Sequence, residues 1–170
     1  MAPELRLIRR EDPWYSEAER LYDDSFPPNE RPPFSALFTE FGGAEELLAV
    51  LDGDRFAGLA VLLTYQDITH ILYLAVEEGL RGCGYGSRIL ALIRERYTGQ
   101  KIIADLELPE ADTPNEVQRE KRIAFYRKNG YCLTGIVYRW EGEDYCIMAS
   151  GGTVTREAFG KFWHHFYSGR

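Results

Sequence analysis

Several absences narrow the class of protein. The chain has no apolar run near the roughly 20 residues that a membrane span needs, and no charged-then-apolar leader. Its three cysteines, Cys83, Cys132 and Cys146, include no close pair. This spacing favours free thiols in a reducing compartment over a disulfide framework or a zinc site. We therefore expect a soluble cytoplasmic protein with no membrane partner and no metal.

Basic residues are in the minority, with 20 Lys and Arg against 27 Asp and Glu and a net charge of −7. This balance argues against nucleic acid as the main partner and mildly favours a cationic substrate. The 170 residues, 45% of them apolar, include no linker-like or repeated segment. We expect one globular domain over residues 1–170, as a monomer or a homodimer.

The most informative segment is a glycine-rich turn between a predicted strand and a predicted helix. Gly82, Gly84 and Gly86 permit backbone dihedrals that other residues avoid, and they place no Cβ in front of the backbone N–H groups. Such N–H groups, together with the positive end of the following helix, form a site for a phosphate. Arg81 adds a permanent positive charge beside them. The segment therefore predicts an anion-binding loop.

Two known kinds of phosphate-binding loop fit the spacing poorly. A P-loop ends in Gly-Lys-Ser/Thr, whereas Gly86 is followed by Ser87 and Arg88. A dinucleotide-binding turn has its glycines directly after the strand, whereas residues 77–81 intervene here. Asp105 does lie about 20 residues downstream, where the ribose-binding acid of that fold stands. A nucleotide-dependent enzyme and a turn without a ligand both stay open as alternatives.

Hydrophobic periodicity and turn residues predict an alternation of strands and helices. The expected strands are 4–9, 47–52, 55–65, 71–76, 101–107, 131–140 and 145–149, and the expected helices are 14–24, 34–41, 87–97, 114–129 and 154–167. Thr113, followed by a proline at the first helical position, is the expected cap of the fourth helix. The strands at 71–76 and 101–107 should be parallel, because a helix joins them. The order predicts an α/β fold of mixed α+β type, with helices on both faces of a mixed sheet.

A third loop pattern, Arg/Gln-x-x-Gly-x-Gly/Ala, matches residues 81–86 at every fixed position. With Leu74-Ala75-Val76 before it, the segment resembles the pyrophosphate loop of the GNAT N-acetyltransferase superfamily, whose members bind acetyl-CoA. The resemblance implies a GNAT-like, partly splayed central sheet in which the pantetheine arm fills the gap. It also implies that acetyl-CoA contacts the residues of the strand end, the loop and the helix start, namely Leu74, Ala75, Val76, Arg81, Gly82, Cys83, Gly84, Tyr85, Gly86 and Ser87.

A second motif, residues 122–131, is similar to the GNAT segment in which a helix ends in Phe/Leu-Tyr-x-x-x-Gly-Phe/Tyr. The two motifs together extend the resemblance over roughly residues 47–149. They imply that Tyr126 binds near the cofactor and acts as the general acid for the departing thiolate, since a phenol of pKa about 10 stays protonated at neutral pH. Packing of Tyr126 in the core is the alternative.

The resemblance implies further catalytic roles. The Leu74 amide would stabilise the oxyanion that forms as an amine attacks the thioester. Glu107, at a strand end, is the first candidate for the general base, and Glu77, Glu78 and His70 are others. A relay of the proton through water, with no single base, also stays open.

Two arginines depart from the pattern of the family. Arg119 and Arg122 share a helical face with Tyr126 by the i, i+4, i+7 rule, and the opposite face, with Val117, Ala124 and Phe125, should pack on the sheet. We therefore expect both arginines to point away from the core and to bind coenzyme A phosphates or an acidic acceptor group, with solvated surface charge as the alternative.

The leading hypothesis is an acetyl-CoA-dependent N-acetyltransferase that transfers an acetyl group to the primary amine of an unidentified small molecule or peptide. The alternative is a non-catalytic acyl-CoA-binding sensor.

Overall fold

The computed structural model describes residues 2–168, which form two compact units. The first unit comprises residues 2–64 and 71–96, and the second comprises residues 65–70 and 97–168. The seven strands have the hydrogen-bonded order β1-β2-β3-β4-β5-β7-β6, and β4 (Ile68–Val76) passes from the second unit into the first. Strands and helices together form the mixed α/β fold that the sequence predicts. The single-domain organisation and the parallel strand pair stay predictions.

The first unit is built on antiparallel strands. β1 (Pro3–Leu7) pairs with β2 (Glu45–Asp52), and β2 pairs with β3 (Arg55–Tyr65). The β2–β3 pair is the predicted hairpin, turned at Gly53, whose φ of +63° is a conformation that favours glycine. β2 contains the run Leu47 to Leu51, which is buried throughout. Such a run indicates a strand that is covered on both faces.

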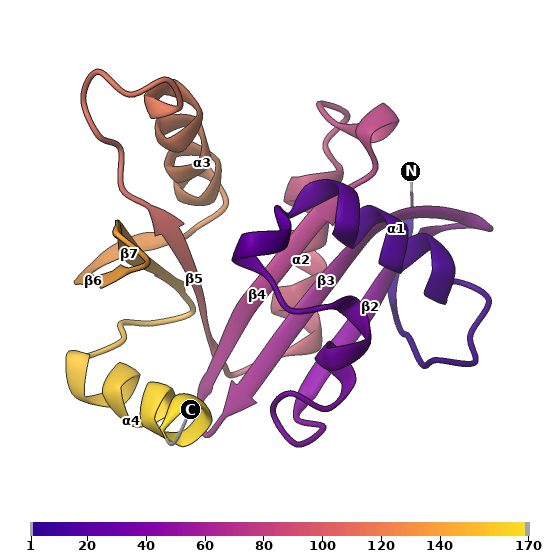
Figure 1. Ribbon diagram of the computed structural model, residues 1–170, viewed down its shortest axis with the longest axis horizontal. Coiled ribbons are helices and arrows are strands. Elements are labelled where there is room, and N and C mark those ends of the chain that lie inside the picture. Colours follow the sequence, from indigo (N-terminus) through magenta and orange to yellow (C-terminus); the bar gives the residue numbers. More distant parts are fainter. Residues whose placement is uncertain (1, 169–170) are drawn as a thin grey trace. The chain divides into compact units, whose positions relative to one another are not determined.

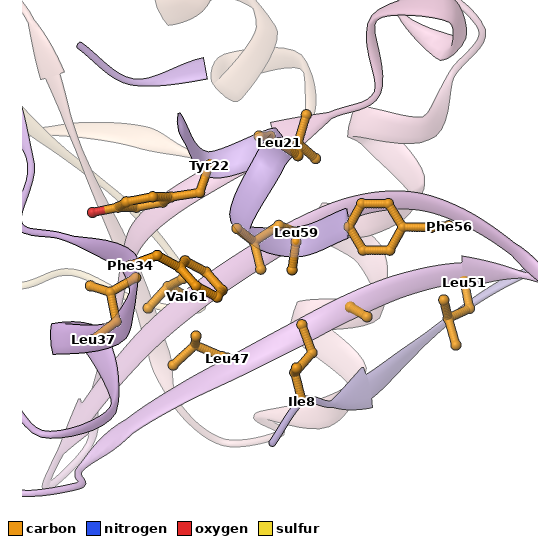
Figure 2. Packing of buried hydrophobic residues seen from close by; sticks show 13 residues of the cluster. Ile8, Leu21, Tyr22, Phe34, Leu37, Leu47, Leu51, Phe56, Leu59 and Val61 are labelled. Carbon is orange, nitrogen blue, oxygen red and sulfur yellow. The ribbon is translucent and has the colours of Figure 1, made fainter. Parts of the chain in front are cut away.

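Two helical segments cover one face of these strands. The side chains of α1 (Tyr15–Ser25) and of the 3₁₀ helix η2 (Phe34–Phe38) pack against Leu47, Leu59 and Val61 (Figure 2). The hydroxyl of Tyr22 donates to the carbonyl of Pro32 at 2.8 Å. This bond ties the proline-rich segment, which includes a second 3₁₀ turn η1 (Pro28–Glu30), to α1.

The opposite face is covered by α2 (Tyr85–Arg96), which buries Ile89, Leu90 and Ile93. Figure 1 shows α1 in front of the strands of the first unit and α2 behind them. The predicted helix at 34–41 is a shorter 3₁₀ helix that ends at Phe38, where the amide of Thr39 donates to the carbonyl of Ala36.

The second unit has its own antiparallel strands. β5 (Lys101–Glu107) pairs with β7 (Glu143–Ser150), and β7 pairs with β6 (Cys132–Trp140). The register of β6 shifts between Leu133 and Val137. Gly135, at φ +82°, lies in this irregular stretch, and the Thr134 hydroxyl beside it donates to the carbonyl of Ile147 at 2.8 Å. The predicted closing hairpin is therefore confirmed, with an interruption in its outer strand.

Two helices belong to the second unit, α3 (Glu116–Lys128) and α4 (Arg156–Tyr167). The hydroxyl of Thr155 accepts a hydrogen bond from the Ala158 amide at 3.1 Å and caps α4. The predicted cap of α3 is wrong. The Thr113 hydroxyl donates to the carbonyl of Glu110 at 2.7 Å instead, and the helix begins after Asn115.

Candidate active site

The predicted anion-binding loop connects a 3₁₀ turn, η3 (Glu78–Leu80), to α2. Gly82 and Gly84 have φ values of +76° and +87°, a region that residues with a Cβ rarely enter. Gly86 lies in the first turn of α2 and has no positive φ. The expected dihedral freedom is therefore required at two of the three glycines, and the third serves only by lacking a side chain.

Arg81 is exposed at the start of this loop, and its Nε donates to the carbonyl of Val76 at 3.1 Å. The bond fixes the guanidinium beside the end of β4. Among the described residues, the two Nη groups of Arg81 have no further hydrogen-bond partner. They present charged donors next to the glycine N–H groups, as the anion-binding prediction requires.

Tyr85 anchors the loop through its side chain, which is buried. Its hydroxyl donates to Oδ2 of Asp52 at 2.5 Å, and the other oxygen of Asp52 accepts from the Ala2 amide at 3.1 Å. The bond from Tyr85, followed by the one from Ala2, holds the pKa of Asp52 below its usual value. Tyr85 can therefore reach a cofactor only through its backbone, while Cys83 is exposed and Ser87 is half-buried.

The end of β4 lies close to β3. A Cβ built on Gly58 would lie 2.5 Å from the carbonyl oxygen of Ala75, and the Glu77 amide donates to the Ala57 carbonyl at 2.9 Å. Gly58 therefore permits a close approach that any other residue would obstruct. Ala75 is one of the three residues predicted to contact the cofactor, and Leu74 and Val76 flank it; their binding role stays a prediction.

The arginines predicted to face the cofactor differ from each other. Arg119 is buried, and its guanidinium contacts Glu107 at 2.8 Å, Glu143 at 3.1 Å and the carbonyl of Leu108 at 3.0 Å. Arg122 is exposed. The expectation that neither points into the unit's interior is therefore wrong for Arg119, because two carboxylates and a carbonyl give its charge a buried set of partners.

The opposite face of α3 is also not where the helical pattern places it. Val117 is 60% exposed and Ala124 is exposed, so these two residues do not pack on the sheet as expected, whereas Phe125 is half-buried. Arg119 is the buried residue of this helix. Charge pairing with β5 and β7, rather than an apolar stripe, therefore orients α3.

Two of the candidate bases form ion pairs. Glu107 contacts Arg119, and Glu77 forms an ion pair with Arg20. Glu78 lies exposed in η3. These geometries favour structural roles for Glu107 and Glu77, and the catalytic assignment of Glu107 stays a prediction.

Tyr126 is half-buried near the end of α3. Burial, and then the nearby carboxylate of Asp105, raises the pKa of Tyr126 to about 12, against a smaller opposing effect of Arg122. The phenol is therefore protonated at neutral pH, which is the state that a general acid needs. Its ring packs edge-on against Tyr131 at 5.2 Å, so a packing role is also present.

A carboxylate that sequence reasoning considered only for a ribose lies at the centre of a polar cluster in the second unit. Oδ1 of Asp105 lies 3.0 Å from Nε2 of His70, and Oδ2 accepts a hydrogen bond from the hydroxyl of Tyr138. Burial acts to raise the pKa of Asp105, but His70 and the bond from Tyr138 together outweigh it and hold the pKa below its usual value. Nδ1 of His70 is buried and has no hydrogen-bond partner among the described residues.

One feature of the sequence indicates the polar cluster around Asp105. Asp105 interrupts the apolar run Ile102-Ile103-Ala104, and a carboxylate within a buried strand requires partners. No group of three or more His, Cys, Asp or Glu side chains in residues 2–168 is placed to hold a metal ion. No helix in the described part of the chain is long and apolar enough to cross a membrane.

The structure is an α/β fold in which a glycine-rich loop and an arginine precede the helix α2. The chain belongs to the GNAT acetyltransferase family, because the model of the GNAT acetyltransferase domain matches residues 43–132. This match covers β2, β3, β4, the glycine loop, α2, β5 and α3. A comparison with curated proteins found no matching sequence.

Solved structures show the same fold. A GNAT-family acetyltransferase of Bacteroides thetaiotaomicron is similar with a TM-score of 0.81 and 24% identity, over 98% of this chain and 99% of that one. An aminoglycoside 6'-N-acetyltransferase in complex with coenzyme A has a TM-score of 0.68 and 17% identity, over 86% and 95%. The ribosomal-protein-S18-alanine N-acetyltransferase of Escherichia coli has a TM-score of 0.66 and 14% identity, over 92% and 97%.

Proposed function

We propose that the protein transfers the acetyl group of acetyl-CoA to a primary amine. The observation that carries this proposal is the conformation of the glycine loop. Gly82 and Gly84 adopt positive φ directly before α2, with the guanidinium of Arg81 beside them. This arrangement suits a pyrophosphate, and it lies within the region that matches the acetyltransferase family. The similar aminoglycoside acetyltransferase holds coenzyme A.

The proposed reaction is a direct transfer. The neutral amine nitrogen attacks the thioester carbonyl, the N–C bond forms, and the C–S bond breaks. The amine loses one proton and the departing thiolate of coenzyme A gains one. Tyr126 is the proposed donor of the second proton, because its pKa of about 12 keeps the phenol protonated. The Leu74 amide is the proposed donor to the oxyanion.

Binding is tested by titrating acetyl-CoA calorimetrically into the wild type and into Gly84→Val. Gly99→Val is a matched control, because Gly99 has a φ of +84°, against +87° for Gly84, and lies in the turn after α2. We expect Gly84→Val to lose acetyl-CoA affinity and Gly99→Val to keep it. Equal affinity in both variants would remove the basis of the proposal.

A non-catalytic acyl-CoA sensor is the second candidate, and the engagement of Glu107 by Arg119 favours it. Release of free thiol from acetyl-CoA, measured over a panel of primary amines, separates the two. Turnover with any amine supports the transferase. Tight acetyl-CoA binding without turnover supports the sensor.

A further inference from the structure

The carboxylate of Asp105 can accept more hydrogen bonds than its two side-chain partners donate. Each of its oxygens takes one side-chain donor, from His70 or from Tyr138. A carboxylate offers about four lone-pair sites. The side chain is 27% exposed, so a solvent molecule or a ligand can reach it. An ammonium group, which has three N–H donors and a positive charge, suits the remaining lone-pair sites of this carboxylate.

Aromatic rings continue outward from this carboxylate. The Tyr138 ring stacks on Tyr145, with centroids 5.3 Å apart and planes 14° apart, and it lies 5.5 Å from the Trp163 ring. Trp163 in turn lies 6.2 Å from Trp140. These rings come from β6, β7 and α4, so secondary structure fixes each of them.

Exposure increases along this series. Tyr138, Tyr145 and Trp163 are half-buried, and Trp140 is 53% exposed. Arg139, which stands between Tyr138 and Trp140 in the sequence, forms an ion pair with Asp144. The exposed indole of Trp140 extends the row of half-buried rings to the surface, and aromatic faces attract cations through their quadrupoles. The surface thus combines one anion with a row of flat apolar groups.

We propose that the acceptor binds on this surface, formed by Asp105, Tyr138, Tyr145, Trp163 and Trp140, and that it is a primary amine attached to an aromatic or similarly flat apolar body. The inference rests on the proposed transfer to an amine and names its substrate class. The ammonium binds Asp105, and the body lies against the rings. The net charge of −7 favours the approach of such a cation. A small amine that lacks the apolar body would leave the rings uncovered.

Three probes separate the two halves of this site. 2-Phenylethylamine carries both the charge and the ring, 2-phenylethanol lacks the charge, and ethylamine lacks the ring. Each is titrated calorimetrically into protein saturated with coenzyme A. We expect 2-phenylethylamine to bind about tenfold or more tightly than either other probe, the scale of a charged hydrogen bond or a cation–π contact. Equal affinity for ethylamine would overturn the assignment.

Two variants then locate the contacts. Asp105→Asn should lose about tenfold or more in affinity for 2-phenylethylamine and leave the affinity for 2-phenylethanol unchanged. Trp140→Ala should weaken both ring-bearing probes and leave ethylamine unchanged. Asp144→Asn is the control, because this carboxylate lies on β7 directly before Tyr145 and pairs with Arg139. Unchanged binding in both Asp105→Asn and Trp140→Ala would refute the proposal.

The outcome is distinct from that of the proposed function. If ethylamine is acetylated as well as 2-phenylethylamine, the transferase stands and this substrate class fails. If 2-phenylethylamine binds through Asp105 but acetyl-CoA releases no thiol, the binding site stands and the transferase fails. Because Trp140 is largely exposed, its truncation tests the site even if Asp105→Asn does not fold.

Discussion

The hydroxyl of Tyr85 donates to the carboxylate of Asp52, and this bond fixes the glycine loop to the end of β2. Tyr85 stands between Gly84 and Gly86, so its backbone cannot shift without moving both. The ring is buried although the loop around it is exposed. A conformation with two positive φ angles is thus maintained by a neighbouring side chain rather than by the glycines themselves.

Replacing Tyr85 by Phe should loosen the loop and raise the KM for acetyl-CoA. It should also change the acid stability. The pKa of Asp52 is held low in the folded protein, so its bond contributes stability above the unfolded pKa of about 3.9 and loses it as the pH falls through the folded pKa. The melting temperature should therefore fall less steeply between pH ~6 and ~2 in Tyr85→Phe than in the wild type. Parallel profiles would show that the bond does not form in solution.

Tyr126→Phe should lower kcat by roughly 10² or more with little change in acetyl-CoA affinity, the effect of losing a general acid. Because the pKa of Tyr126 is about 12, kcat/KM of the wild type should not yet fall at the pH of about 10 where an ordinary phenol ionises. Phe125→Leu is the control for packing, since its ring lies 5.3 Å from that of Tyr126. Wild-type turnover in Tyr126→Phe would assign the residue to packing alone.

Arg119→Ala should destabilise the fold by about 3 kcal/mol, because it leaves the carboxylates of Glu107 and Glu143 without their buried partner. Arg122→Ala, on the same helix but exposed, should change the free energy of unfolding by less than about 0.5 kcal/mol. Urea denaturation measures both. If Arg122 holds a coenzyme A phosphate, its variant instead raises the acetyl-CoA KM in a salt-sensitive way.

Gly58→Ala should cost about 1–3 kcal/mol of stability, because the added methyl would lie 2.5 Å from the Ala75 carbonyl. It should also raise the acetyl-CoA KM if the end of β4 binds the pantetheine arm. Gly160→Ala tests the same change in open space, inside α4, where it should stabilise by about 0.5–1 kcal/mol. A Gly58→Ala protein as stable as the wild type would contradict the close approach.

Local signals predicted the elements well. β5 has the predicted bounds, and the apolar residues of α2 are buried as its periodicity requires. The glycine loop was found because its function depends on consecutive residues. Such features are encoded by neighbours along the chain, and sequence reasoning reads them directly.

Contacts between distant residues were not predictable in the same way. Asp105 and Tyr138 are 33 positions apart and meet only because β7 lies between their strands. The helical pattern gave the face on which Arg119 lies but not the two carboxylates that bury it. Gly58 has no side chain to signal its role. The contacts of Asp105, Arg119 and Gly58 all depend on the pairing and register of strands, which a single sequence specifies poorly.

The irregularity at Gly135 also affects how well the outer strand can pair with another chain. β6 is last in the strand order, and it exposes Leu133 and Val137, 47% and 48% accessible to solvent. A straight, apolar border strand would offer an uninterrupted row of peptide groups for another polypeptide to extend, which is how many fibrillar aggregates begin. The left-handed Gly135 and the Thr134 hydroxyl bonded to Ile147 break that row. The irregularity at Gly135 thus permits exposed apolar residues on an edge strand that would otherwise favour aggregation.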